Sequence, residues 1–263
     1  MHTHLEFIFT PLSELLGKAG ASIACLKGGV SSYPIAEYVL QSIFLKMTGF
    51  QEQKLKCICW ELASEDYGYR YKRILSGELG ECSCYAEKCK VFGDVIKAIR
   101  GKDKSFDFAS FCASLPVAEI SSSIYEFYMR TNHVCWLERS YLQYKDFAWC
   151  SMGGNCLRSK GCGSIFGECK DCINKAQCPV RTEQRSFVSL SNLFTDAVFN
   201  FRNKCAHNIL AYQCNKPPLA KLYEQADLAE NYLVRFALLM MIDMVFIRLF
   251  GEWLKLIEDK MAV

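Results

Sequence analysis

The stretch LAENYLVRFALLMMIDMVFIRLFGEWLKLIEDK, residues 228–260, decides the fold. Apolar side chains cover nearly all sides of this stretch when it is wound as a helix, so we expect the central or dimer-facing helix of a bundle. Arg235, Asp243 and Arg248 interrupt it, and its longest uncharged run, FALLMMI, is far below the roughly 20 residues that a membrane span needs. The stretch therefore predicts a helix buried in protein and not one that crosses a bilayer.

The composition of the chain is that of a globular protein. Of its 263 residues, 51% are hydrophobic and 22% are charged, and the formal net charge is only +3. A disordered chain is less apolar than this, and a surface that binds polyanions would have to be local. The first residues, MHTHLEFIFTPLSELLG, lack the basic start and apolar block of a secretory signal. We therefore expect a soluble protein of the cytoplasm that does not associate with membranes.

Helical spacing of apolar residues recurs along most of the chain. The segments that predict helices are 36–50, 51–75, 116–149, 186–212 and 228–260. Gly49 is expected to end the first of these helices, and the residues NKPP (215–218) follow the end of the fourth. No segment shows the convincing alternation of a strand, so the predicted fold class is all-α.

Two segments with clustered cysteines interrupt this helical pattern and divide the chain into three parts. Residues 1–149 are expected to be the N-terminal helical part of the bundle, with a loop or insertion at about 76–115. Residues 150–180 form a cysteine-rich insertion, and residues 181–263 hold the motif-bearing helix and the final apolar helix. We expect one helical bundle that carries cysteine-rich insertions.

The stretch FRNKCAHN, residues 201–208, places polar chemistry near the end of an apolar helix. Asn203 and His207 are four residues apart and share a helix face, and Arg202 lies about 140° from His207 around the axis. A histidine can move a proton to or from a hydroxyl, and a guanidinium can hold a phosphate and neutralise its developing charge. These groups are the parts needed for an RNA 2′-hydroxyl to attack its own 3′-phosphate without a metal. A surface arrangement or a helix cap would also account for them.

The order Arg202-Asn203-x-x-Ala206-His207 resembles the R-x4–6-H motif of HEPN-domain proteins, in which a polar residue follows the arginine directly. The layout is similar too, because the motif lies late in one long helix and is followed by a turn and a final apolar helix. The resemblance is close over about 186–258. It extends to the N-terminal helices only in architecture, and it is absent from the cysteine-rich insertion.

The resemblance implies a HEPN-like helical bundle and a metal-independent endoribonuclease that cuts single-stranded or loop RNA. Arg202 and His207 would be catalytic, and Asn203 would support them. HEPN proteins generally form homodimers in which two motifs line one RNA cleft, and many are toxins with an antitoxin partner or act in phage defence. One departure is Ile209, because some HEPN toxins have a tyrosine two residues after the histidine. The family also includes non-catalytic RNA-binding and regulatory members, and that alternative stays open.

Two further groups of polar residues lie outside the motif. Glu52 and Lys54, in GFQEQKLK (49–56), are candidates for an accessory role, although the exposed N-terminus of a helix is the favoured explanation. Arg130 and His133 form a second arginine–histidine pair. Their spacing differs from that of the motif and they lie in an aromatic-rich helix, so we interpret His133 as structural.

Six of the sixteen cysteines fall within residues 150–178. A segment so poor in apolar residues cannot fold by burial alone, and four thiolates around a structural zinc ion would cross-link it. The expected ligands are Cys162, Cys169, Cys172 and Cys178, with Cys150 and Cys156 next. An iron–sulfur cluster is the alternative, since ligation would be by cysteine alone. In a third hypothesis this cluster is itself the functional centre and senses metal supply or redox state.

Cysteines outside the insertion and basic residues within it are further candidates. Some of them allow two interpretations, and others are expected to be structural. Cys82, Cys84 and Cys89 could form a partial second metal site or be ordinary thiols. Cysteines within helical patterns are expected to be buried like small apolar residues: Cys57, Cys59, Cys112, Cys135 and Cys205. Basic residues of the insertion could contact RNA phosphates or form a solvated surface: Arg158, Lys160, Lys170, Lys175 and Arg181.

Overall fold

The computed structural model describes residues 2–26, 32–75, 82–131, 135–151, 193–207 and 228–261. Every regular element within these ranges is helical, which confirms the all-α fold class. The α-helices are α1 (His2–Phe9), α2 (Leu12–Ala24), α3 (Tyr33–Glu65), α4 (Tyr67–Leu75), α5 (Tyr85–Lys102), α6 (Phe108–Ser114), α7 (Val117–Thr131), α8 (Cys135–Ser151), α12 (Phe201–His207) and α13 (Tyr232–Met261). A π-helical element, η2 (Thr195–Asn200), and a 3-10 element, η4 (Leu228–Glu230), complete the set.

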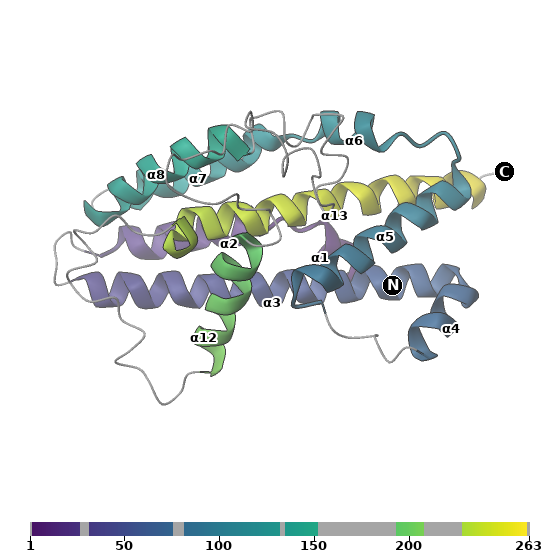
Figure 1. The fold of residues 1–263 in the computed structure, drawn as a ribbon, viewed down its shortest axis with the longest axis horizontal. Coiled ribbons are helices and arrows are strands. Elements are labelled where there is room, and N and C mark those ends of the chain that lie inside the picture. Colours follow the sequence, from purple (N-terminus) through teal and green to yellow (C-terminus); the bar gives the residue numbers. More distant parts are fainter. Residues whose placement is uncertain are drawn as a thin grey trace, which may run out of the picture.

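The long apolar helix lies at the centre of the bundle, as the sequence predicts. α13 packs against α2, α3, α5, α7 and α8, and Figure 1 shows it between α3 on one side and the α7–α8 pair on the other. Its residues are buried without a break from Tyr232 to Asp243, so every face of this N-terminal part of the helix touches protein. No helix in the described part of the chain is both long enough and apolar enough to cross a bilayer.

α3 runs without interruption through Gly49, so the prediction that this glycine ends a helix is wrong. A glycine inside a helix costs only about 1 kcal/mol relative to alanine. Buried side chains on both sides of it, among them Phe44, Met47 and Leu55, anchor the helix to the core and outweigh that cost. The helical path breaks later, at Asp66, whose backbone is extended with φ −123° and ψ 106°.

The segment 76–115, which was expected to be a loop or insertion, contains α5 and α6. α5 buries Val91, Val95 and Ile99, which recur at every fourth residue as a core-facing helix requires. The glycines and cysteines that precede this repeat dominate the local sequence and obscure it. The predicted helix 116–149 is also different, because it is divided into α7 and α8.

A buried ion pair joins α3 to α13. Lys54 Nζ lies 2.6 Å from Asp243 Oδ1 and donates to the carbonyl oxygen of Thr10 at 2.6 Å, while Asp243 Oδ2 accepts from the backbone N–H of Leu12 at 3.0 Å. The two charged side chains are only 1% and 2% exposed, so the interpretation of Lys54 as part of an exposed helix N-terminus is wrong. Burial lowers the pKa of Lys54 and raises that of Asp243, and the opposite charge of each partner counteracts the shift.

We expect the loss of one partner of this pair to destabilise the fold strongly. Asp243→Asn should lower the free energy of unfolding by about 3–5 kcal/mol, because it leaves the ammonium of Lys54 buried without a counter-charge. Urea unfolding followed by circular dichroism measures this change. Glu252→Gln on the same helix is the control: its ion pair with Lys255 is well exposed, so its loss should cost less than about 1 kcal/mol. Equal losses for the two variants would contradict the role given to the buried pair.

Candidate functional site

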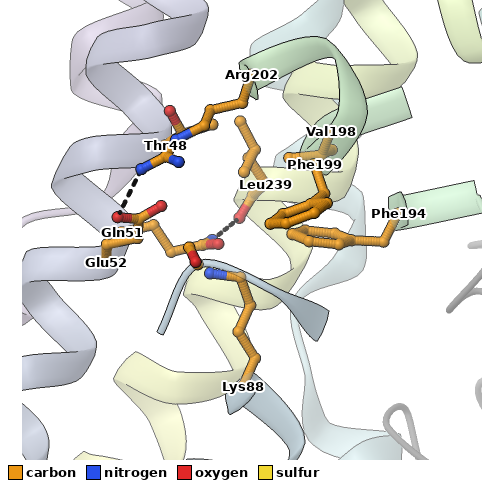
Figure 2. Close-up of a pocket in the computed structure, with 10 residues that line it drawn as sticks. Thr48, Gln51, Glu52, Lys88, Phe194, Val198, Phe199, Arg202 and Leu239 are labelled. Atoms are coloured by element: carbon orange, nitrogen blue, oxygen red, sulfur yellow. Dashed lines mark hydrogen bonds and ion pairs between the residues drawn. The ribbon is translucent and has the colours of Figure 1, made fainter. Parts of the chain in front are cut away.

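Arg202 and Glu52 meet where α12 packs against the middle of α3 (Figure 2). Arg202 Nη2 lies 3.3 Å from Glu52 Oε2, and Arg202 Nη1 donates to Asn203 Oδ1 at 3.1 Å. The side chains of Arg202 and Glu52 are 28% and 17% exposed, so the ion pair is partly open to solvent. The two acceptors give the guanidinium a defined direction, and its exposure lets it reach a ligand.

A π-helical turn and a buried arginine set the position of Arg202. η2 leads directly into α12, and the carbonyl of Ala197 in η2 accepts a hydrogen bond from Arg235 Nε at 2.9 Å. The Arg235 guanidinium also lies 3.4 Å from the centre of the Phe201 ring, which is a close cation–π contact. Because Phe201 directly precedes Arg202, these contacts fix the start of α12 relative to α13.

A buried polar network supports Arg235 in turn. The Tyr232 hydroxyl donates to Glu37 Oε1 at 2.6 Å, and Gln41 Nε2 donates to the same oxygen at 3.1 Å. Burial raises the pKa values of Glu37 and Tyr232 and lowers the pKa of Arg235. All the charged members of this network have partners inside the core, so the network supports the site and is not itself open to a ligand.

A small pocket lies behind the ion pair, between α3, α5, η2 and α13 (Figure 2). It has room for about one water molecule. Lys88 extends into it and donates from Nζ to the carbonyl of Cys82 at 2.7 Å. Gln51 donates from Nε2 to the carbonyl of Leu239 at 2.8 Å, and its Oε1 is buried without a hydrogen-bond partner among the described residues. The pocket therefore holds polar atoms that a water or a ligand atom would satisfy.

Lys88 brings a buried positive charge into this pocket. The residue is only 2% exposed, and burial lowers the pKa of its ammonium to about 8, although the negative charge of Glu52 acts in the opposite direction. Its hydrogen bond goes to a neutral carbonyl, and its Nζ lies 5.5 Å from the centre of the Phe194 ring. A buried ammonium whose pKa is lowered to about 8 makes the charge of the pocket responsive to pH.

The structure brings the predicted Arg202 and Asn203 together and adds Glu52 from α3. His207 is the last residue of α12, about 1.4 turns after Arg202. The interpretation of Glu52 as part of an exposed helix N-terminus is wrong, because it lies in the middle of α3 and pairs with Arg202. Lys54 is engaged by Asp243 in the core and does not join the site. Of the helix predicted over residues 186–212, the structure describes residues 193–207.

Most of the predicted metal ligands lie outside the described residues. Five of the six cysteines of the insertion and all five of its basic candidates fall in residues 152–192, and for Cys150 the structure gives only its place in α8. Cys82, Cys84 and Cys89 are described, at the start of α5. Within the described ranges, no three histidine, cysteine, aspartate or glutamate side chains form a group that could hold a metal ion.

The second arginine–histidine pair and the cysteines of the helical segments are the remaining sequence candidates. Arg130 Nη1 donates to a backbone carbonyl of α2 at 3.5 Å and so links α7 to α2, while His133 lies outside the described residues. The cysteines in helical patterns differ in burial. Among those whose side chains are described, Cys57 and Cys59 are buried as expected, and Cys112 and Cys205 are half-buried.

Sequence reasoning did not identify Gln51, Lys88 or Arg235 as parts of the site. Arg235 is visible in the sequence as a charge within an apolar helix, and that isolation signals a need for a buried partner. Lys88 fell in a segment expected to be a loop, where a lysine is normally exposed. Gln51 has no signal of its own, because only the packing of α3 on α13 shows that its amide is buried.

Comparisons of the chain with protein-family models, with curated proteins and with solved structures gave no match.

We expect Lys88→Met to stabilise the protein near neutral pH and to lose this advantage at about pH 10. Below its folded-state pKa of about 8, the buried ammonium is disfavoured relative to the unfolded chain, where the pKa of lysine is about 10.4. The penalty is about 3 kcal/mol at neutral pH and disappears as pH rises from about 8 to about 10.4. Urea unfolding of variant and wild type at both pH values measures it. Lys97→Met, at an exposed position of α5, is the control, and an equal effect of both substitutions would contradict the prediction.

Proposed function

We propose that this chain is a metal-independent endoribonuclease of HEPN type that cuts single-stranded or loop RNA with Arg202 and His207. The proposal rests on the arrangement along α12. There, a partly exposed guanidinium is oriented by Glu52 and Asn203, and His207 ends the same short helix. Attack by an RNA 2′-hydroxyl needs a guanidinium to hold the phosphate and an imidazole to move the proton. DNA lacks that hydroxyl.

In the proposed reaction, His207 takes the proton of a 2′-hydroxyl, and the 2′-oxygen attacks the adjacent phosphorus atom. The bond from phosphorus to the 5′-oxygen of the next nucleotide breaks, that oxygen leaves with the proton that His207 took up, and a 2′,3′-cyclic phosphate remains. Arg202 donates to the phosphate oxygens as negative charge develops on them. Its contacts with Glu52 and Asn203 use two of the five N–H donors of a guanidinium, so donors are left for phosphate.

RNA is therefore the proposed partner, and a homodimer with two copies of α12 along one cleft is the proposed assembly. The net charge of +3 is too small to attract RNA strongly from a distance, so local groups have to provide the binding. The biological role we propose is that of a toxin or phage-defence nuclease under the control of an antitoxin or another regulatory partner.

The ion pair of the site also favours a second function, that of a non-catalytic RNA-binding or regulatory module. Glu52 neutralises part of the charge of Arg202, so a phosphate has to compete with a carboxylate for the guanidinium. If that competition keeps the phosphate away from His207, RNA binds in a salt-dependent manner and is not cut.

His207→Ala is expected to abolish RNA cleavage, and Arg202→Ala to slow it by a factor of about 100 or more. Purified wild type and variants are incubated with mixed single-stranded RNA in excess chelator, and the product ends are analysed for 2′,3′-cyclic phosphate. Lys204→Ala, at an exposed position of the same helix, is the matched control and should cut like wild type. Circular dichroism with and without chelator shows whether each protein is folded.

Two outcomes of this experiment would change the assignment. Cleavage by His207→Ala at the wild-type rate would show that His207 is not catalytic. Salt-dependent binding of RNA by the folded wild type without any product would favour the regulatory module.

We also propose that the cysteine-rich insertion binds a structural zinc ion through Cys162, Cys169, Cys172 and Cys178. Metal analysis of the protein purified under reducing conditions should give about one zinc ion per chain and no visible absorbance. Cys169→Ser should lose the metal, because it removes half of the C-x-x-C pair, and Cys57→Ser in the core of α3 should keep it. Bound iron with visible absorbance would instead indicate an iron–sulfur cluster and favour a sensor of metal or redox state.

A further inference from the structure

One face of α3 is exposed over most of the length of the helix. Its residues follow one another at steps of three or four and therefore share that face. They are Tyr38, Ser42, Lys46, Gly49, Gln53, Lys56, Trp60 and Ser64, all exposed except the half-buried Lys56. With a rise of 1.5 Å per residue, this open face of α3 is roughly 40 Å long. None of its residues takes part in the proposed cleavage.

The open face of α3 passes beside the candidate site. Around the axis of the helix, Glu52 lies about 60° to one side of Gly49, and Phe50 lies about 100° to the other side. Glu52 pairs with Arg202 of α12, and Phe50 packs on Phe7 of α1 with ring centres 4.4 Å apart. The open face therefore runs between α12 and α1, and the guanidinium of Arg202 borders it.

The charge of the open face is positive. Lys46 and Lys56 lie on it, and neither has an ion pair among the described residues. None of its residues is acidic. Glu52 and Glu61, which flank it, are already engaged in ion pairs with α12 and α1. A polyanion laid along this face therefore meets free lysines and no free carboxylate of the face itself.

Two large aromatic side chains stand near the ends of the open face. Tyr38 is 67% exposed and Trp60 is 59% exposed. Exposed rings next to lysines are the combination that binds single-stranded nucleic acid, because bases stack on the rings and phosphates pair with the lysines. Lysine is depleted in protein–protein interfaces, so a second protein chain is the less suitable occupant. A duplex keeps its bases stacked inside, and only a single strand offers them to the rings.

Gly49 lies between the two rings, about one turn before Glu52. Its backbone is helical, and a Cβ atom added there would meet nothing within 4 Å. Neither packing within the described residues nor backbone conformation requires a glycine, although it costs about 1 kcal/mol in a helix. A glycine does allow the backbone of a bound ligand to approach the helix closely.

We propose that the open face of α3 is a binding track for single-stranded RNA that leads past the candidate site. Bases stack on Tyr38 and Trp60, and phosphates lie against Lys46 and Lys56. The strand passes closest to the helix at Gly49. The inference rests on the proposed action on RNA, and it supplies the local positive surface that a small net charge requires.

The test measures binding of a fluorescein-labelled oligouridylate of about 12 nucleotides by fluorescence anisotropy. The parent of every variant is the full chain with His207→Ala, so that the RNA stays intact. Trp60→Ala should raise the Kd by roughly 5- to 100-fold, because a stacking platform is lost, and Trp60→Phe should keep most of the affinity. Tyr125→Ala removes an exposed ring of α7 and is the matched control, with an unchanged Kd.

The salt dependence of binding tests the lysines. Lys46→Gln and Lys56→Gln should each reduce the slope of log Kd against log salt concentration by about 0.7, the value for one phosphate contact on a single strand. Lys97→Gln, at an exposed position of α5, should leave the slope unchanged.

Gly49→Gln separates binding from stability. Gly93 of α5 also has open space around it, so Gly93→Gln is the matched control. Both substitutions should raise the melting temperature, because glutamine is a better helix former than glycine. Only Gly49→Gln should also weaken the binding of RNA, since its side chain occupies the place of the strand.

The proposal is overturned if the folded parent does not bind the oligouridylate, or if Trp60→Ala and Gly49→Gln bind it as tightly as the parent does. It is also overturned if Trp60→Ala dissociates a dimer in sedimentation experiments and leaves RNA binding unchanged, because the face would then join two copies of the chain. Cleavage is measured separately with His207 intact. Weakened binding by the track variants without any cleavage would therefore reject the nuclease and keep the track, and cleavage without these effects would do the reverse.

Discussion

The alignment of α3 with α13 depends on the ion pair between Lys54 and Asp243. Removing two charges from water costs several kcal/mol per ion, and this cost is offset only when the charges meet and their remaining hydrogen bonds are satisfied. The carbonyl of Thr10 and the N–H of Leu12 complete those bonds, which ties the junction of α1 and α2 to the same point. A slip of one helical turn would bury the two charges apart. The apolar faces alone tolerate several alignments, and the ion pair selects one.

The same alignment extends to the candidate site. α3 and α13 run in the same direction (Figure 1), and one turn before the ion pair Gln51 donates to the carbonyl of Leu239. One turn before Leu239 on α13, Arg235 contacts η2 and so fixes the start of α12. Arg202 therefore meets Glu52 through helices that are fixed against one another. Sites built on rigid elements are more precise than sites on loops, and this one is carried by helices throughout.

The features that were predicted correctly are those that a local pattern determines. The class of the fold and the central position of α13 follow from the period and density of apolar residues. Arg202 and Asn203 stand out in the sequence by their chemistry and spacing, and their role in a functional site stays a prediction. The helix end predicted at Gly49 is wrong because the packing on both sides of this glycine outweighs its local cost of about 1 kcal/mol. Glu52 was assigned to an exposed helix end because its partner lies 150 residues away, and no local pattern shows an ion pair between distant segments.

The buried charges of the described residues differ in what holds them. Lys54 and Asp243 neutralise each other, and Arg235 is held by a carbonyl and by aromatic faces. These contacts offset the cost of burying the charges and make the core more rigid. Lys88 has a neutral carbonyl and one aromatic ring, and the adjacent Gln51 has an unsatisfied oxygen. Polar groups whose burial is poorly compensated are expected at functional sites, because packing alone does not retain them.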